Sequence, residues 1–457
     1  MKRREFLTLP MGGGPGLSEE EARRLIDRIL AVSGADGTSV ALSANRRINS
    51  RYAVNRITTA GETVDLTAAI TARFGQRSAT LSVNEFDDDS LIEAVRSVEG
   101  MARLAPEDPE SMPLLGPQEY GPSGGWHEST AGLDAESRAA VARSAIETAE
   151  AADGDITASG FMEARAGERA IGNSAGLFAY HPATAVSYSL TARTGDGTGS
   201  GWAGIGHRDW SRVDSDAMHA TAIQKALRSR SPRRLEPGAY PVILEAQAVA
   251  DLIGLLVRAL DARAADEGRS AFSAPDGTKL GQHVVDERVT LQSDPLAAGD
   301  APFAVGGLPA RPIRWIEDGV LNNLAYSRFW AQKKGREPIS IPGSFRMEGG
   351  EGTVDDLIAS TERAVLVTRL WYIRSLDPRT ILHTGLTRDG TFWVEDGQIS
   401  HPVNNFRWND SPLSVLRNLE DLGRPVRVTA GGSGDSMREA PPLRASEFTF
   451  SSISEAV

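Results

Sequence analysis

The sequence predicts an α+β protein, with an N-terminal α/β domain of meandering sheet and helices and a C-terminal, largely antiparallel, barrel-like β domain. Two patterns support this prediction. The first half alternates capped amphipathic helices with strand-like segments. In the second half Asp-Gly pairs separate apolar runs, and such pairs supply the positive φ angles that tight hairpin turns need. Helices and antiparallel strands in separate runs are typical of the α+β class.

The first helix is expected to begin at Ser18, because Ser18 and Glu21 have the spacing of a capping box. Apolar residues then recur at helical spacing from Ala22 to Leu30. A second capped helix is expected to open at Ser90, in the run Ser90-Leu91-Ile92-Glu93. Strands are predicted between these helices at 38–44, 54–59, 65–74 and 78–83.

The next part follows a proline-rich stretch, 106–122. We expect helices at 134–152 and 215–227, and strands at 157–164, 170–180 and 185–194. The glycine-rich segment 194–201 lacks the lysine of a phosphate-binding P-loop and the Gly-x-Gly-x-x-Gly frame of a dinucleotide site. A mobile loop or a hairpin tip is the better interpretation.

The main domain boundary is placed in the Pro- and Arg-rich segment near residue 230. The expected organisation is a flexible N-terminus (1–17), an N-terminal domain (18–230), a C-terminal domain (231–445) and a tail (446–457). Beyond the boundary, hairpin turns are predicted at Asp318-Gly319, Asp389-Gly390 and Asp396-Gly397. One strong helix is predicted at 247–263, and a last one from Ser411 and Pro412 to a stop at Gly423.

Bulk composition excludes several functions. The net charge of -12 argues against a general nucleic-acid or membrane-surface binder, because both are anionic. The absence of cysteine excludes disulfides and thiolate metal sites. Arg3-Arg4 resembles a twin-arginine export motif, but a weakly apolar, glycine-rich run follows, so a cytoplasmic protein is expected.

The segment 366–416 contains the most informative residues: Trp371-Tyr372, His383-Thr384-Gly385 and Asn404-Asn405-Phe406-Arg407. It resembles the C-terminal signature of the TldD/TldE (PmbA) family. The resemblance implies two domains, a two-subunit assembly around a chamber, and a helix that carries His-Glu-x-x-x-His in the zinc-bearing members. Aligning the flanks of the 247–263 helix places Ile253, Gly254 and Arg258 at the three motif positions. We therefore expect no metal and no catalytic residue in this chain, with zinc in a TldD-like partner.

Other catalytic arrangements have little support. No two of the seven histidines lie three or four residues apart, although a zinc site built from distant residues stays open as an alternative. There is no Gly-x-Ser-x-Gly elbow and no Walker sequence. His383, Arg388 and Asp389 could form a catalytic cluster, but the predicted turn favours a structural role. The candidate substrate-binding residues are Arg374, His383, Thr384, Arg388, Asn404, Asn405 and Arg407.

Three functional hypotheses follow from the resemblance. The first is a TldE-like, non-catalytic subunit of a metallopeptidase that cleaves unfolded peptides or matures a modified peptide. The second is a stand-alone homodimer that binds peptides or a small metabolite. The third is an enzyme repurposed for other chemistry in the same chamber.

Overall fold

The computed structural model describes residues 16–429 and 436–455, so Arg3-Arg4 lies outside the described residues. The helices are α1 (Glu19–Ala31), α2 (Asp88–Leu104), α3 (Glu128–Ala131), α4 (Ala135–Glu150), α5 (Ser215–Arg228), α6 (Ala246–Arg258), α7 (Ala262–Asp266), α8 (Arg328–Lys334), α9 (Val354–Ala359) and α10 (Pro412–Arg417), with short 3-10 turns η1 (Trp210–Arg212) and η2 (Val305–Gly307). No helix in these ranges is both long and apolar enough to cross a bilayer.

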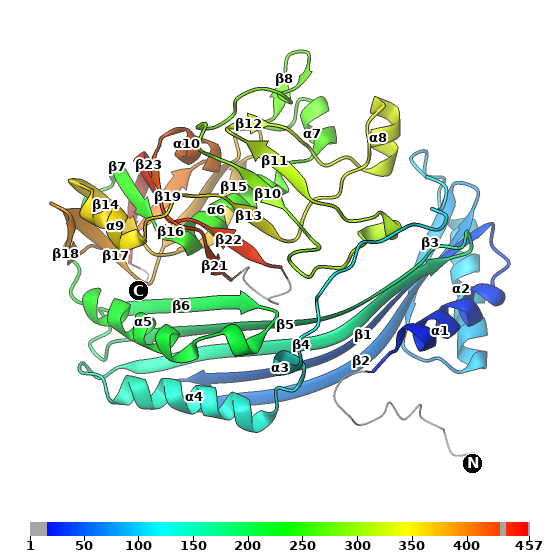
Figure 1. Cartoon of the computed structure of the whole chain (residues 1–457), viewed down its shortest axis with the longest axis horizontal. Coiled ribbons are helices and arrows are strands. Elements are labelled where there is room, and N and C mark those ends of the chain that lie inside the picture. The colour runs from blue at the N-terminus through cyan, green and yellow to red at the C-terminus, as the bar shows by residue number, and fades with distance from the viewer. Residues whose placement is uncertain (1–15, 430–435, 456–457) are drawn as a thin grey trace.

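The N-terminal half forms one long antiparallel sheet in the order β3-β2-β1-β4-β5-β6. Its strands are β1 (Gly37–Ala53), β2 (Arg56–Phe74), β3 (Arg77–Val83), β4 (Thr157–Asn173), β5 (Phe178–Arg193) and β6 (Ser200–His207). Alternate residues of β1 face the helices: Val40 and Leu42 pack with α1 and α2, and Ile48 and Tyr52 with α4 and α5. The four long helices of the N-terminal half, α1, α2, α4 and α5, therefore cover one face of the sheet, and the C-terminal half lies over the other (Figure 1).

Three strand boundaries differ from the predictions. The predicted strands at 38–44, 54–59 and 65–74 are two long strands joined by a turn at Val54 and Asn55, where φ is positive. The predicted strands at 157–164 and 170–180 are also wrong as separate units, because β4 runs unbroken to Asn173. In each case the strand is continuous, but polar residues interrupt the alternation of apolar and polar residues by which a strand is recognised in a sequence.

The C-terminal half contains two larger sheets. One has the order β12-β11-β10-β13-β22-β21, the other β15-β16-β19-β23-β7-β14-β17-β18 with β20 added beside β23. Their strands are β7 (Gly238–Leu244), β10 (Leu291–Ser293), β11 (Ile313–Glu317), β12 (Val320–Leu321), β13 (Phe345–Met347), β14 (Arg363–Val367), β15 (Leu370–Asp377), β16 (Leu382–Thr387), β17 (Thr391–Glu395), β18 (Gln398–Pro402), β19 (Asn405–Asp410), β20 (Leu419–Leu422), β21 (Val426–Val428), β22 (Arg438–Ala440) and β23 (Leu443–Ser454). A small hairpin, β8 (Ser273–Ala274) and β9 (Gly277–Thr278), stands apart.

The α+β prediction is confirmed, and the C-terminal pairing is antiparallel except for β13–β22 and β7–β14. Both large sheets stay open in the described part of the chain, so the barrel-like closure does not form there. The predicted tail is different in the structure: residues 446–454 belong to β23, which pairs with β7 and β19. Phe448 and Phe450 of that strand are buried, which anchors the end of the chain in the core.

Two of the three Asp-Gly turns are confirmed as hairpins. Asp318-Gly319 joins β11 to β12, and Asp396-Gly397 joins β17 to β18, all four residues with positive φ. Asp389-Gly390 also has positive φ, but strands β19, β23, β7 and β14 lie between the two strands that it connects. The hairpin prediction is wrong there, because the turn redirects the chain toward a distant strand.

The helix caps were predicted with mixed success. Ser18 and Glu21 form the expected capping box of α1. The second helix begins earlier than expected, with Asp87 as its N-cap and Ser90 inside its first turn. The last helix begins at Ser411 and Pro412, as predicted, but ends at Asn418 rather than at Gly423, because the following residues form β20.

Candidate functional site

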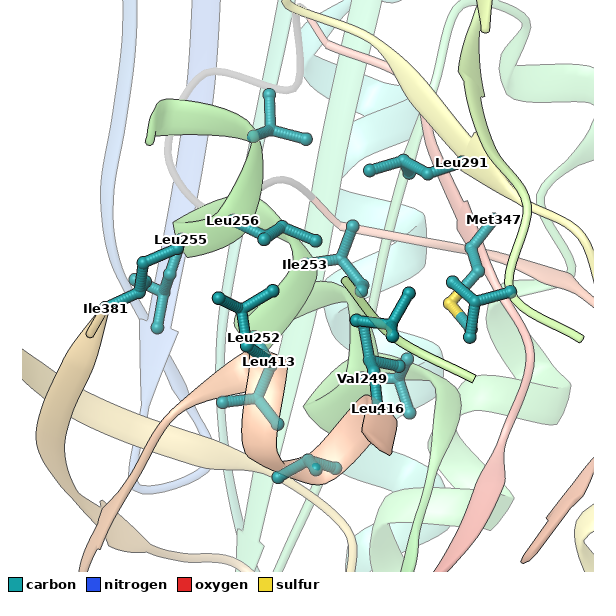
Figure 2. Close-up of a cluster of buried hydrophobic side chains, with 14 of the residues drawn as sticks. Val249, Leu252, Ile253, Leu255, Leu256, Leu291, Met347, Ile381, Leu413 and Leu416 are labelled. Atoms are coloured by element: carbon teal, nitrogen blue, oxygen red, sulfur yellow. The ribbon is translucent and has the colours of Figure 1, made fainter. Parts of the chain in front are cut away.

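Helix α6 occupies the centre of the C-terminal core. It was expected to reach residue 263, but it ends at Arg258 and α7 follows. Its apolar side chains pack against elements from both sheets. Figure 2 shows Ile253 pointing toward Leu291 of β10 and Met347 of β13, and the opposite side of the helix meeting Leu413 of α10.

The three residues at the family's metal positions have unlike surroundings. Ile253 is 1% exposed and belongs to the apolar core. Arg258, at the end of α6, is exposed. Gly254 faces Arg438 of β22: a Cβ at Gly254 would lie 3.2 Å from Nη1 of Arg438 and 3.8 Å from Nη1 of Arg258. Two cationic groups thus converge on this side of the helix.

One carboxylate lies near these cations. Asp251, one turn before Gly254, accepts a hydrogen bond from Gln247 Nε2 at 3.0 Å. Burial raises the pKa of Asp251 to about 7, against the opposing effect of Arg369 and Arg438. Burial likewise lowers the pKa of Arg438. Among residues 16–429 and 436–455, no three His, Cys, Asp or Glu side chains come together in a way that could hold a metal ion.

Four of the predicted substrate-binding residues form a group on neighbouring strands. Arg374 on β15 is paired with Thr384 on β16, and Arg407 Nη1 on β19 donates to Thr384 Oγ1 at 3.3 Å. His383 is next to Thr384, and its Nδ1 lies 2.8 Å from the carbonyl oxygen of Ile381. The guanidinium of Arg374 lies over the Tyr372 ring at 4.4 Å.

The other three predicted residues, Arg388, Asn404 and Asn405, lie outside this group. Arg388 stacks over the Trp371 ring at 4.3 Å. The side-chain oxygen of Asn404 accepts a hydrogen bond from the Leu235 amide at 2.7 Å, and that of Asn405 accepts one from Thr391 Oγ1 at 2.9 Å. Both asparagines line a small cavity of about 230 Å³. The seven residues therefore do not converge on one centre, and their role in substrate binding stays a prediction.

A larger cavity, about 340 Å³, lies between the two halves of the molecule. Its floor is the helix-free face of the long sheet, where Asn45, Arg165 and Arg169 project from β1 and β4. Its opposite wall consists of loops at 300–313 and 338–343 of the C-terminal half. We refer to this space as the interdomain cleft.

One end of the interdomain cleft is fastened by Arg208, which follows β6. Its guanidinium donates to the carbonyl oxygens of Ala298 at 2.7 Å and Thr184 at 3.1 Å, and it pairs with Asp300 at 2.5 Å. His181 Nε2 lies 3.3 Å from the carbonyl oxygen of Gly299, a residue with φ of +71°. Burial, reinforced by Arg208, lowers the pKa of His181 to about 4, so the imidazole is neutral at pH 7.

Sequence reasoning missed the interdomain cleft, because its walls come from segments more than a hundred residues apart. One usable signal was present. Arg165, Gly167 and Arg169 alternate with alanine and glutamate, which places them on one face if the strand is continuous. The prediction interrupted the strand at this point.

Comparisons with known proteins identify the class of protein. Residues 128–230 match the family model described as the PmbA/TldA metallopeptidase central domain, and residues 237–452 match the C-terminal domain of the same family. Residues 231–236 lie between the two matches. The chain belongs to the TldD/TldE (PmbA) family.

Individual relatives agree with this assignment. The chain is 24% identical to "Metalloprotease PmbA" of Escherichia coli O157:H7 over 88% of this chain and 89% of the relative. It is 25% identical to a "Metalloprotease" of Methanothermobacter thermautotrophicus over 59% of this chain and 63% of that protein. The crystal structure of TldE from Thermococcus kodakarensis has the same fold, with a TM-score of 0.83 and 19% identity, over 94% of this chain and 99% of that one.

Proposed function

We propose that this chain is the TldE/PmbA-like, non-catalytic subunit of a TldD/TldE-type metallopeptidase that acts on unfolded or modified peptides in the cytoplasm. Zinc would be held by a TldD-like partner. The observation that carries the proposal is the surroundings of Ile253, Gly254 and Arg258. A zinc site needs lone-pair donors such as imidazole or carboxylate, and an isoleucine, a glycine and a guanidinium supply none.

Electrostatics supports the same proposal. A divalent cation beside Gly254 would meet the guanidinium groups of Arg438 and Arg258 within a few ångströms. Like charges at such distances repel strongly where water is scarce. Among the charged groups named above near Gly254, Asp251 is the one carboxylate. A single carboxylate is a poor zinc site.

The peptide-binding part of the proposal has support in the sheet edges. Strand β15 lies at the edge of the large C-terminal sheet and carries the predicted residue Arg374. An edge strand offers backbone donors and acceptors to an added peptide strand, with little dependence on peptide sequence. Trp371 and Tyr372 of β15 are 38% and 52% exposed, which offers apolar contacts at the same edge.

The test is to assign the metal to a subunit. The purified chain, alone and coexpressed with a TldD-like protein that contains the His-Glu-x-x-x-His motif, is analysed for zinc, for mass in solution and for cleavage of an unfolded peptide. We expect no zinc and no cleavage by this chain alone, and one zinc per heterodimer together with cleavage. Stoichiometric zinc in this chain alone would overturn the proposal, as would a metal-free homodimer that never associates with the partner.

A further inference from the structure

The two guanidinium groups beside Gly254 of α6 lie close together without an ion-pair partner. Nη1 of Arg438 and Nη1 of Arg258 lie 3.2 Å and 3.8 Å from the position that a Cβ of Gly254 would take, so the two nitrogens are at most about 7 Å apart. Across residues 16–429 and 436–455, neither guanidinium forms a hydrogen bond or an ion pair, and Nε of Arg438 is buried without a partner. Like charges at this distance repel each other, so an anion between them would stabilise the arrangement.

Local structure explains the position of Arg258 but not the approach of Arg438. Arg258 belongs to the last turn of α6, where the helix dipole attracts a cation. Arg438 lies on β22, which packs against α6, and its guanidinium carbon is 5.3 Å from the centre of the buried Phe345 ring. Because Gly254 has no Cβ, this guanidinium can lie directly against the helix.

The acids near this point do not neutralise both arginines. Asp251 attracts Arg438, but the structure shows no ion pair between these two described residues. Burial raises the pKa of Asp251 to about 7, so this carboxyl is only about half ionised at pH 7. Glu439 follows Arg438 on β22 and therefore projects from the other face of the strand, where it pairs with Arg427 at 3.0 Å. Among the described residues, positive charge is thus in excess beside Gly254.

The donors and their surroundings favour a carboxylate. A guanidinium is planar, and its parallel N–H groups match the two oxygens of a carboxylate. A single negative charge is also the better balance, because Asp251 already supplies part of one. Arg258 is exposed, so a ligand can reach the pair from solvent, whereas Ile253 and Leu255 on the adjoining turns of α6 are buried and apolar.

We propose that Arg258 and Arg438 form a carboxylate-binding site beside Gly254, which holds either the C-terminal carboxylate of a peptide or a small carboxylate. Both sources present the same group, and each guanidinium donates N–H groups to it. The inference deepens the proposed function, on which the peptide source rests, because it assigns to this subunit the end of the peptide that it would hold.

Two kinds of probe test the site in the full chain. A seven-residue unstructured peptide with an N-terminal fluorophore is prepared with a free C-terminal carboxylate and as its C-terminal amide, and binding is followed by fluorescence anisotropy. Acetate and inorganic phosphate are each compared with chloride at equal ionic strength, by the midpoint of thermal unfolding. We expect the free peptide to bind about tenfold or more tightly than its amide. We also expect acetate to raise the midpoint, because a ligand of the folded state stabilises that state.

The principal variant is R258Q, because Arg258 is exposed and its replacement leaves the core intact. R438Q removes the second cation, and circular dichroism verifies that this variant folds. We expect either change to remove most of the difference between the two peptides and most of the acetate effect. The matched control is R346Q, because Arg346 is an exposed arginine on the neighbouring strand β13, where it pairs with Glu439 at 3.7 Å. It removes the same charge and is expected to behave like wild type.

The outcomes separate this inference from the proposed function. A preference for the free peptide that R258Q removes supports the peptide terminus as the ligand. An acetate effect that R258Q removes, without binding of either peptide, supports a small carboxylate and argues against the peptide-binding part of the proposed function. Stabilisation by phosphate and not by acetate would overturn the carboxylate assignment. The absence of both effects, or their full retention in the R258Q/R438Q double variant, would also overturn it. Zinc content and association with the TldD-like partner are expected to be unchanged in the double variant, so a failure there concerns the proposed function instead.

Discussion

The hydroxyl of Ser200 donates a hydrogen bond of 2.6 Å to the carboxylate of Asp389, joining the last strand of the N-terminal sheet to the C-terminal domain. Asp389 is 1% exposed and also accepts from Arg369 Nη1 at 3.0 Å. The guanidinium of Arg369 in turn lies 4.2 Å from the centre of the Trp202 ring on β6. A buried charge cluster thus connects the two halves, at the turn where the sequence suggested a hairpin.

Replacing Asp389 is expected to destabilise the protein strongly. In D389A the guanidinium of Arg369, which is 23% exposed, loses its buried carboxylate partner and Ser200 loses its acceptor, a loss of about 2–4 kcal/mol. The measurement is the urea midpoint followed by circular dichroism. The control is E395A, which removes the exposed pair between Glu395 and Arg363 and is expected to cost less than about 1 kcal/mol. Similar midpoints for both variants would argue against the buried cluster.

The Ser200–Asp389 bond itself can be measured by a double-mutant cycle. S200A leaves one oxygen of a buried carboxylate without its donor, which costs about 1–3 kcal/mol. In a D389A background, S200A no longer removes a hydrogen bond to the carboxylate, so it should change the free energy of unfolding very little. We therefore expect a coupling energy of about 1 kcal/mol or more between the two sites. Additive effects would mean that the hydroxyl and the carboxylate stabilise the protein independently.

Ile253 is expected to behave as a core residue. I253A creates a cavity between α6, β10 and β13, at a cost of about 2–5 kcal/mol. The control is I57A on β2, where the side chain is 49% exposed and little packing is lost. Chemical denaturation of both variants provides the comparison. If I253A were as stable as I57A, the side chain of Ile253 would lie in a cavity rather than in the packed core.

Local signals in the sequence predicted the features that depend on a few neighbouring residues. Ser18 and Glu21 are three residues apart and cap their own helix, so no distant contact is needed to predict them. Asp318-Gly319 and Asp396-Gly397 are correct for the same reason. Asp389-Gly390 has the same local chemistry, but its strands pair elsewhere, and strand pairing is decided by the whole sheet.

The interdomain cleft is a feature that could not be predicted from the sequence. Arg165 and Arg169 have the composition of an ordinary solvent-exposed strand face. They line a cleft only because loops at 300–313 and 338–343 fold over that face. The tail prediction failed similarly, because Phe448 and Phe450 become core residues only when β23 enters between β7 and β19.

Glu168 is expected to make stability depend on pH. It is 5% exposed on β4, and burial raises its pKa from 4.5 to about 7, against the opposing backbone hydrogen bonds at Leu17 and Gly16. Between these pH values the folded state binds more protons than the unfolded state, so this group's contribution to stability falls as pH rises from about 4.5 to about 7. E168Q lacks this loss, since its amide does not titrate.

The comparison of E168Q with wild type isolates that contribution. His181 and His207 have pKa values lowered to about 4 by burial, and their contribution rises with pH between about 4 and 6.5. Both histidines are present in both proteins, so they cancel in the difference. We expect E168Q to gain stability relative to wild type as pH increases from 5 to 8, in urea titrations at each pH. A constant difference across this range would contradict the buried, proton-binding carboxyl.

Arg208 is expected to hold the wall of the interdomain cleft in place. Its planar guanidinium bonds two carbonyl oxygens and one carboxylate at once, and a lysine at this position cannot reproduce that fork. In R208K the segment 296–304 loses its fastening to β5, so its amides should exchange with deuterium about tenfold faster or more. Hydrogen exchange followed by mass spectrometry measures the exchange rate of this segment directly.

The control for Arg208 is R311K, because Arg311 lines the same cleft but forms one exposed ion pair with Glu337. Its exchange pattern is expected to match wild type. Both variants keep the positive charge of the cleft, but only R208K removes the contacts that hold its wall. Comparing them therefore distinguishes the effect of the charge from the effect of these contacts. Equal exchange in both variants would mean that the segment 296–304 is held by its own packing.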